Sequence, residues 1–200
     1  MKKDFYLVGW GLTVMLLNIV TNPWISTAVN VVAHALIFVG LIRLKRRNSM
    51  FGAGGLFAVT AALLSVISML TSPVNEAALT NAPSWAWGID ILFSLASLAM
   101  IYAICTGTAR EADKEGETEL AKKMRFGWWT YLVPALIALA LIPILLNFGE
   151  NTNMLAPLLV LGLISLAATI SIIVGLRRAG RDLRSYEENA AADGVKTSGA

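Results

Sequence analysis

Apolar residues dominate six long stretches of this chain, and short polar segments separate the stretches. A transmembrane helix needs roughly 20 apolar residues to cross about 30 Å of hydrocarbon, and the stretches approach or reach that length. The predicted spans are residues 5–20, 24–44, 50–70, 85–107, 126–147 and 154–176. Turns at residues 21–24, 71–84 and 148–153 join the spans in pairs, so the pattern predicts an all-α integral membrane protein of three helical hairpins. The hairpins share an aromatic start and a polar turn, which leaves open whether they form a true structural repeat.

The basic residues predict how these spans are oriented. All 16 Lys and Arg residues fall in four blocks, at residues 2–3, 43–47, 110–125 and 177–196, and two predicted spans separate each block from the next. Cytoplasmic loops of membrane proteins retain Lys and Arg, whereas translocated loops lack them. The blocks therefore predict six crossings with both termini in the cytoplasm.

The composition agrees with a single helical membrane domain. Hydrophobic residues make up 56% of the chain and charged residues only 14%, whereas soluble domains contain roughly 25% charged residues. We predict a six-helix transmembrane domain over residues 1–180, in which residues 108–125 form a charged cytoplasmic segment that Gly116 can interrupt. Residues 181–200 are polar and rich in Ala and Gly, which predicts a disordered cytoplasmic tail.

The formal net charge of +3 bears on the expected partners. A basic chain can bind nucleic acid, but these basic residues lie beside hydrophobic spans, where anionic lipid headgroups are closer. Membrane lipids are therefore the expected partners, and nucleic acid is not. The residues expected to contact lipid headgroups are Arg43, Lys45, Arg46 and Arg47.

Three predicted spans carry small residues at every fourth position, on one face of each helix. Such faces let helix backbones approach closely in lipid. The helix-packing candidates are Gly54, Ala58, Ala62, Ala99, Ala103, Gly107, Ala167, Ser171 and Gly175. Packing within one chain is the simplest interpretation, and contact with a second copy in a homo-oligomer or with another membrane protein stays open.

Two ionisable residues, His34 and Asp90, lie at membrane depth, where a charge costs at least about 2.5 kcal/mol and usually faces a cavity or a partner. Asn30 shares a helix face with His34, one turn nearer the outside, and its depth is similar to that of Asp90. The candidate polar intramembrane cluster comprises Asp90, Asn30, His34, Ser94 and Ser97. The cluster fits either a set of interhelical hydrogen bonds or a solute site open to the outside.

The sequence carries no recognisable motif for catalysis. It contains one His and one Cys, which is too few for a zinc site built on those ligands. It also lacks the glycine-rich phosphate-binding loop and the nucleophile motifs of common enzymes. We therefore predict no metal, no cofactor and no enzymatic activity.

One region carries a resemblance to known proteins. Residues 102–112 (YAICTGTAREA), 119–125 (ELAKKMR) and 128–132 (WWTYL) resemble a group of small multi-pass membrane proteins of Gram-positive bacteria, mainly over residues 100–132. The resemblance implies a bacterial plasma membrane and no particular activity. The function expected first is a non-enzymatic accessory, sensor or immunity-type protein that acts through helix or lipid contacts. The alternative is a small-solute transporter, or its membrane-embedded substrate-binding subunit, with an outward polar pocket.

Overall fold

The computed structural model describes residues 2–18, 23–71, 84–148 and 155–197, and these residues form six helices with no strand among them. The helices are α1 (Lys2–Leu16), α2 (Pro23–Leu44), α3 (Ser49–Thr71), α4 (Ser84–Lys114), α5 (Thr118–Phe148) and α6 (Leu155–Thr197). The predicted all-helical class is confirmed. The turns predicted at residues 21–24, 71–84 and 148–153 lie largely outside the described residues.

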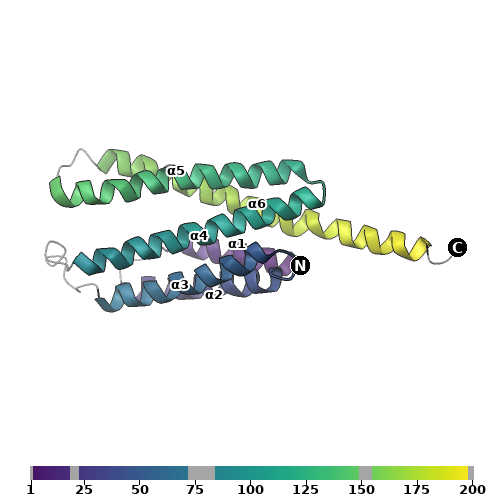
Figure 1. The fold of residues 1–200 in the computed structure, drawn as a ribbon, viewed down its shortest axis with the longest axis horizontal. Coiled ribbons are helices and arrows are strands. Elements are labelled where there is room, and N and C mark those ends of the chain that lie inside the picture. Colours follow the sequence, from purple (N-terminus) through teal and green to yellow (C-terminus); the bar gives the residue numbers. More distant parts are fainter. Residues whose placement is uncertain (1, 19–22, 72–83, 149–154, 198–200) are drawn as a thin grey trace.

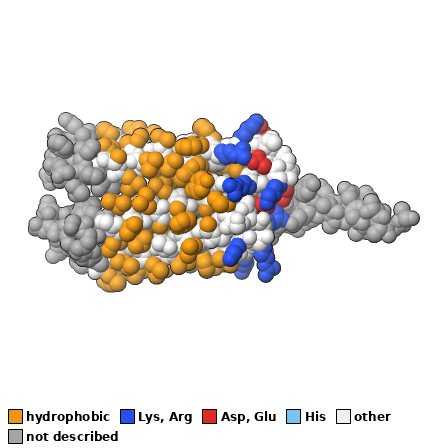
Figure 2. Space-filling model, in the orientation of Figure 1, with side chains coloured by type: hydrophobic (Ala, Val, Ile, Leu, Met, Phe, Trp, Pro, Cys, Tyr) orange, Lys and Arg blue, Asp and Glu red, His pale blue; other side chains and the backbone are white. Residues whose placement is uncertain are grey.

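Five of these helices, α2 to α6, are long and apolar enough to cross a membrane. Helix α1 is shorter, since its 15 residues rise about 22 Å at roughly 1.5 Å per residue. Large apolar side chains cover the middle of the molecule, as Figure 2 shows for one face. Leu56, Leu63, Val133, Leu159 and Leu163 are examples, each at least half exposed. An apolar surface of this kind is stable against hydrocarbon rather than water.

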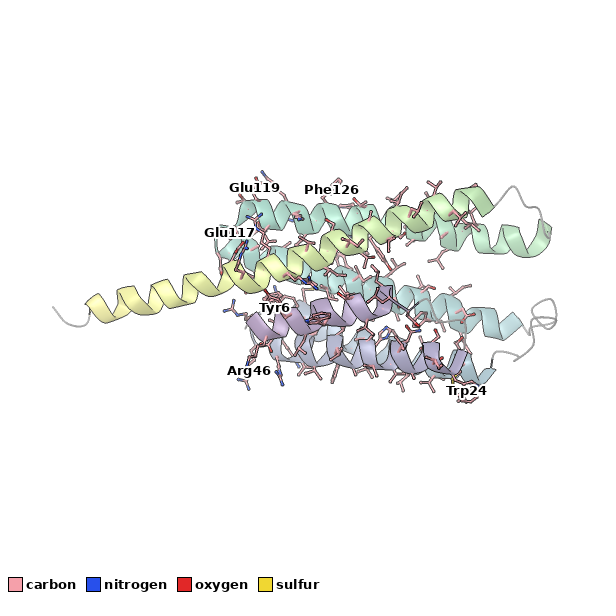
Figure 3. All side chains as sticks on the ribbon, turned by 180° about the vertical axis from the view of Figure 1, so that it is seen from behind. Tyr6, Trp24, Arg46, Glu117, Glu119 and Phe126 are labelled. Atoms are coloured by element: carbon pink, nitrogen blue, oxygen red, sulfur yellow. The ribbon has the colours of Figure 1, made fainter. Side chains whose placement is uncertain are left out.

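Consecutive helices run in opposite directions (Figure 1), and their contacts form a closed ring. Each helix packs against the next one in the sequence, α1 closes the ring against α6, and α4 also contacts α6. Lys and Arg side chains gather at one end of this bundle, which we call the basic end (Figure 2). Figure 3 places Arg46, Glu117 and Glu119 at the basic end and Trp24 at the opposite end.

The largest buried side chains lie in the half of the bundle nearest the basic end. They include Phe5, Leu41, Phe51, Met124 and Leu176, all with at most 1% exposure. The rings of Phe5 and Phe51 meet edge to face with centroids 6.1 Å apart, a favourable arrangement for two aromatic side chains. Met100 and Ile104 of α4 belong to the same core, which therefore holds all six described helices together.

The break predicted at Gly116 is confirmed. Helix α4 ends at Lys114, α5 begins at Thr118, and Gly116 between them has a φ of 80°. Glycine adopts this left-handed conformation without the steric penalty that a Cβ would impose. The charged segment 108–125 therefore consists of the end of α4, a short turn at Gly116 and the start of α5. It lies at the basic end.

The C-terminal segment belongs to the longest of the described helices. Helix α6 continues to Thr197, across residues for which the sequence predicts a disordered tail, and it projects beyond the bundle (Figure 1). Two interactions support the start of this extension, since Asp182 accepts hydrogen bonds from Nε of Arg178 and of Arg181, each at 2.9 Å. The run of three alanines at residues 190–192 also has high helix propensity.

The small-residue faces contribute to packing to different degrees. A Cβ placed on Gly54 would lie 3.1 Å from Cβ of Ala103, and one placed on Gly107 would lie 2.8 Å from Cε1 of Phe51. A Cβ placed on Gly175 would lie 2.5 Å from Sδ of Met124, and Ala58 is fully buried. Ala62, Ala99 and Ser171 are partly buried. Ala167 is exposed, so the face of α6 turns toward the surface at that level.

Arg47 differs from the other residues expected at lipid headgroups, because it turns into the protein. Its side chain is only 18% exposed, and Nη1 lies 3.1 Å from Oε1 of Glu115 and 3.9 Å from Oε2 of Glu111. Glu111 is itself buried and also accepts hydrogen bonds from Nζ of Lys114 at 2.7 Å and from Nδ2 of Asn48 at 3.4 Å. This carboxylate network joins the α2–α3 turn to the end of α4. Arg43, Lys45 and Arg46 remain exposed.

Candidate functional site

A polar cavity of about 250 Å³ lies between α2, α3 and α4, toward the end opposite the basic end. The first turns of α2 and α4 and the last turns of α3 meet there because these helices alternate in direction. The cavity is lined by Ser26, Thr27, Asn30, Ser65, Ser68, Met69, Asp90 and Phe93. Its lining therefore combines hydroxyl groups, one carboxamide and one carboxylate in an otherwise apolar layer.

Asp90 supplies the charge of this cavity. Oγ of Ser68 donates a hydrogen bond to Oδ1 of Asp90 at 2.7 Å, which links α3 to α4. No Lys or Arg occurs between residues 48 and 109, and Asp90 forms no ion pair with any described side chain. A carboxylate at this depth is costly without a counter-charge, so the site favours a cationic ligand.

Asn30 reaches the same cavity and is also held by α1. Nδ2 of Asn18 donates to Oδ1 of Asn30 at 2.9 Å and to Ser26, whose Oγ and carbonyl oxygen lie 3.0 and 3.1 Å away. Oδ1 of Asn18 is buried with no hydrogen-bond partner within the described part of the chain. The Asn18 carboxamide therefore acts as a clamp between the end of α1 and the start of α2.

His34 does not line the polar cavity. Its imidazole is 1% exposed, and Nδ1 lies 2.7 Å from the carbonyl oxygen of Asn30 on the same helix, so Nδ1 is the nitrogen that carries a proton. Nε2 is buried without a hydrogen-bond partner among the residues described, and the ring packs edge to face against Phe93 at 6.0 Å. His34 instead borders a separate apolar cavity of about 240 Å³ between α2 and α3.

The two serines of the predicted cluster lie apart from the cavity. Oγ of Ser94 donates to the carbonyl oxygen of Asp90 at 2.9 Å, one turn earlier on α4. Ser97 is buried, and its Oγ has no partner within the described ranges. The structure therefore brings Asn30 and Asp90 to one cavity, and it places His34, Ser94 and Ser97 elsewhere.

Sequence reasoning missed the hydroxyl groups of α2 and α3. Ser65 and Ser68 are three residues apart on α3, and Ser26 stands four residues before Asn30 on α2. Each pair has the spacing of one helix face, which was the signal available in the sequence. The sequence does not show that α3 packs between α2 and α4. This packing brings the polar face of α2 and the polar face of α3 to Asp90.

The size and chemistry of the cavity limit what it can hold. About 250 Å³ lies just below the roughly 300 to 1,000 Å³ typical of drug-sized ligand pockets, so the cavity suits a small solute. Among the described residues, no group of three or more His, Cys, Asp and Glu side chains could hold a metal ion. One carboxylate surrounded by hydroxyl and amide oxygens instead suits a monovalent cation or a small ammonium group.

Comparisons with protein-family models, with curated proteins and with solved structures find no match to this chain.

Proposed function

We propose that the chain crosses a bacterial plasma membrane six times, with both termini and the basic end in the cytoplasm. One observation supports the membrane crossings and another supports the orientation. Five helices have the length and hydropathy of membrane spans, and α1 packs in the same bundle beside α2 and α6. The alternating helix directions collect Lys and Arg side chains at one end, as the retention of basic residues in cytoplasmic loops requires.

Cysteine labelling tests this orientation. In a Cys105→Ala background, we expect Ala78→Cys, between α3 and α4, to react with a membrane-impermeant maleimide in intact cells. Lys45→Cys, at the exposed end of α2, should react only after the cells are permeabilised. Cys105 is 1% exposed, so the unmodified protein serves as a control with little labelling. Labelling of Lys45→Cys in intact cells would contradict a cytoplasmic basic end.

Within this orientation, we propose that the protein binds a small cationic solute from the outer side, as a transporter or as its membrane-embedded binding subunit. The observation that carries the proposal is Asp90, a carboxylate in a polar cavity whose described lining contains no basic side chain. A cation that enters the cavity would neutralise a charge that the membrane otherwise makes costly. The hydroxyl groups and the Asn30 carboxamide supply further oxygen ligands.

Binding measurements on purified protein in lipid nanodiscs test the proposal. The probes are Na⁺, ammonium, methylammonium and tetramethylammonium, titrated by calorimetry at constant ionic strength. We expect saturable binding of at least one probe, and a loss of at least about tenfold in affinity in Asp90→Asn, because a hydrogen bond to a charged group contributes about 1.5 to 3 kcal/mol. Uptake into proteoliposomes then separates a transporter from a binding subunit.

Glu119→Gln is the matched control for Asp90→Asn. It removes one carboxylate from an exposed position at the basic end, where Glu119 forms an ion pair with Lys122 at 3.4 Å. Its affinity for the same probe should equal that of the unmodified protein. Equal binding by Asp90→Asn and Glu119→Gln would refute the assignment of Asp90 as the ligand group.

The second candidate function is a non-enzymatic accessory protein that acts through helix contacts. The Asn18 clamp favours it, because three oxygen atoms of α2 already satisfy the Nδ2 group that faces this region. In that case the polar residues stabilise the bundle and have no ligand. The same titration distinguishes the two functions, since an accessory protein shows no saturable binding of any of the four cations.

A further inference from the structure

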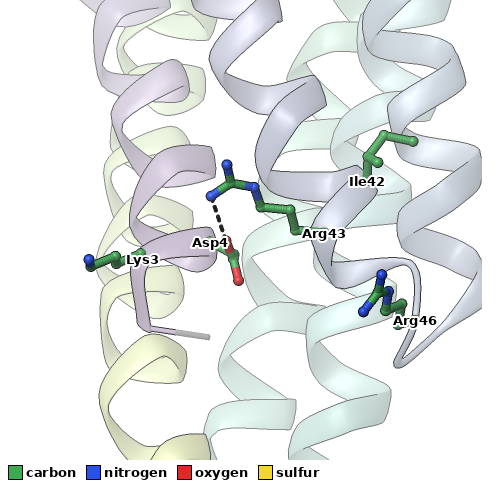
Figure 4. A pocket seen from close by; sticks show the side chains of 5 residues that line it. All are labelled: Lys3, Asp4, Ile42, Arg43 and Arg46. Carbon is green, nitrogen blue, oxygen red and sulfur yellow. Dashed lines mark hydrogen bonds and ion pairs between the residues drawn. The ribbon is translucent and has the colours of Figure 1, made fainter.

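A second hollow, of about 570 Å³, lies at the basic end between the first turn of α1 and the last turn of α2. Lys3, Asp4, Ile42, Arg43 and Arg46 line it, and Figure 4 shows the basic side chains around this opening. The hollow lies at the opposite end of the molecule from the polar cavity of Asp90 and shares no residue with it.

The charges of this hollow are not balanced. Three basic side chains line it with one carboxylate, and Nη1 of Arg43 reaches Oδ1 of Asp4 at 3.5 Å. Lys3 and Arg46 form no ion pair with any side chain that the structure describes. Other basic residues at this end do face carboxylates: Arg47 faces Glu115, Lys114 faces Glu111, Arg125 faces Asp113, and Arg178 and Arg181 face Asp182.

The hollow also has an apolar border. Ile42 lines it and is 42% exposed, and Val39, one turn earlier on α2, is 40% exposed. These two side chains lead from the basic residues toward the apolar middle of the molecule. A ligand with an anionic group joined to a hydrocarbon chain would match these two surfaces. Its charged group would lie beside the basic residues, and its hydrocarbon chain would lie beside Ile42 and Val39.

We propose that this hollow is a binding site for the phosphate of an anionic phospholipid of the cytoplasmic leaflet, with an acyl chain beside Ile42 and Val39. The proposal rests on the orientation proposed above, which places the basic end at that leaflet, and it does not depend on solute binding by Asp90. Arg43 and Arg46 supply guanidinium groups, which bind phosphate oxygens in pairs, and Lys3 supplies a third charge from α1. The site thus differs from a general attraction of basic loops to lipid, because basic side chains from the start of α1 and from the end of α2 and the turn after it line one hollow.

Native mass spectrometry of the full chain in detergent tests this site. The probes are dihexanoyl phosphatidylglycerol, dihexanoyl phosphatidylcholine and inorganic phosphate. We expect one saturable phosphatidylglycerol site, and a roughly 30-fold loss of its affinity in the double variant Lys3→Gln with Arg46→Gln. Phosphatidylcholine, which has no net charge, should bind at least about tenfold more weakly than phosphatidylglycerol.

The double variant Lys122→Gln with Lys123→Gln is the charge-matched control. It removes the same two charges from the first turns of α5, away from the hollow, and should bind phosphatidylglycerol within twofold of the unmodified protein. An equal loss in both double variants would overturn the site in favour of diffuse attraction. Displacement of phosphatidylglycerol by inorganic phosphate at equal concentration would also overturn it, since the ligand would then be soluble phosphate. Labelling of Lys45→Cys in intact cells would refute the orientation, and the affinities for phosphatidylglycerol and phosphatidylcholine would not change.

Discussion

Replacement of Arg47 by Leu should lower the free energy of unfolding by about 3 to 5 kcal/mol, the range measured when one partner of a buried ion pair is removed. Arg47 is 18% exposed, and its carboxylate neighbours Glu111 and Glu115 are 6% and 12% exposed. Glu115 directly follows α4, and its N–H donates to the carbonyl oxygen of Glu111 at 3.2 Å, so the two carboxylates lie on one face of this last turn and repel each other without the guanidinium group. The quantity to measure is the unfolding midpoint and slope in a titration with a denaturing detergent.

Lys122→Leu is the control for this result. Its ion pair with Glu119 is 71% and 75% exposed, and exposed pairs contribute about 1 kcal/mol or less. The addition of Glu115→Gln to Arg47→Leu should recover part of the lost stability, because it removes one of the two repelling charges. A loss in Arg47→Leu no larger than that in Lys122→Leu would contradict a structural role for the network.

Replacement of Gly11 by Leu should destabilise the bundle by roughly 2 to 3 kcal/mol, at the upper end of the range for overpacked positions. A Cβ at Gly11 would lie 2.5 Å from Cγ1 of Ile37 and 2.7 Å from the carbonyl oxygen of Ala33. The carbonyl oxygen belongs to the backbone of α2, so the clash is relieved only if α1 moves away. We expect a lower midpoint in the same detergent titration.

Gly162→Leu is the matched control, because nothing lies within 4 Å of a Cβ at that position on α6. Its stability should equal or exceed that of the unmodified protein, since Gly in a helix interior costs about 1 kcal/mol relative to good helix formers. If both variants unfold at the same detergent concentration, the close approach of α1 and α2 at Gly11 does not limit stability.

The number and order of the helices could be predicted from the sequence, because a span of apolar residues is a local signal that needs no knowledge of neighbours. Gly11 and Gly40 could not be singled out in the same way. Each lies among large residues, with Leu7 and Met15 four positions from Gly11, so neither forms a small-residue stripe. One Gly on each helix lets α1 and α2 approach, Gly11 beside Ala33 and Gly40 beside Asp4, and only the packing reveals these positions.

The candidate site was predictable to a similar extent. Depth follows from counting residues along a helix, and Asn30 and Asp90 do reach the same cavity. The side chains that neighbouring helices present at each depth do not follow from that count. His34 lies on the same face of α2 as Asn30 but one turn deeper, where α3 presents Ala58, Val59 and Ala62. The buried position of Arg47 was equally hard to predict. A charged residue in a turn is expected at the surface, and only the packing shows that the end of α4 lies beside it and supplies Glu115.

The shortness of α1 has a consequence for the surrounding bilayer. Its 15 residues rise about 22 Å, whereas the 22 residues of α2 rise about 33 Å, so in the six-span arrangement proposed above lipids beside α1 would meet a hydrophobic mismatch. A bilayer adjusts to a short span by thinning locally, and the thinned region here would border the side of the bundle where Asn18 contacts α2. Water and ions would then approach Asn30 through less hydrocarbon than elsewhere around the protein, and membranes of different thickness should change that distance.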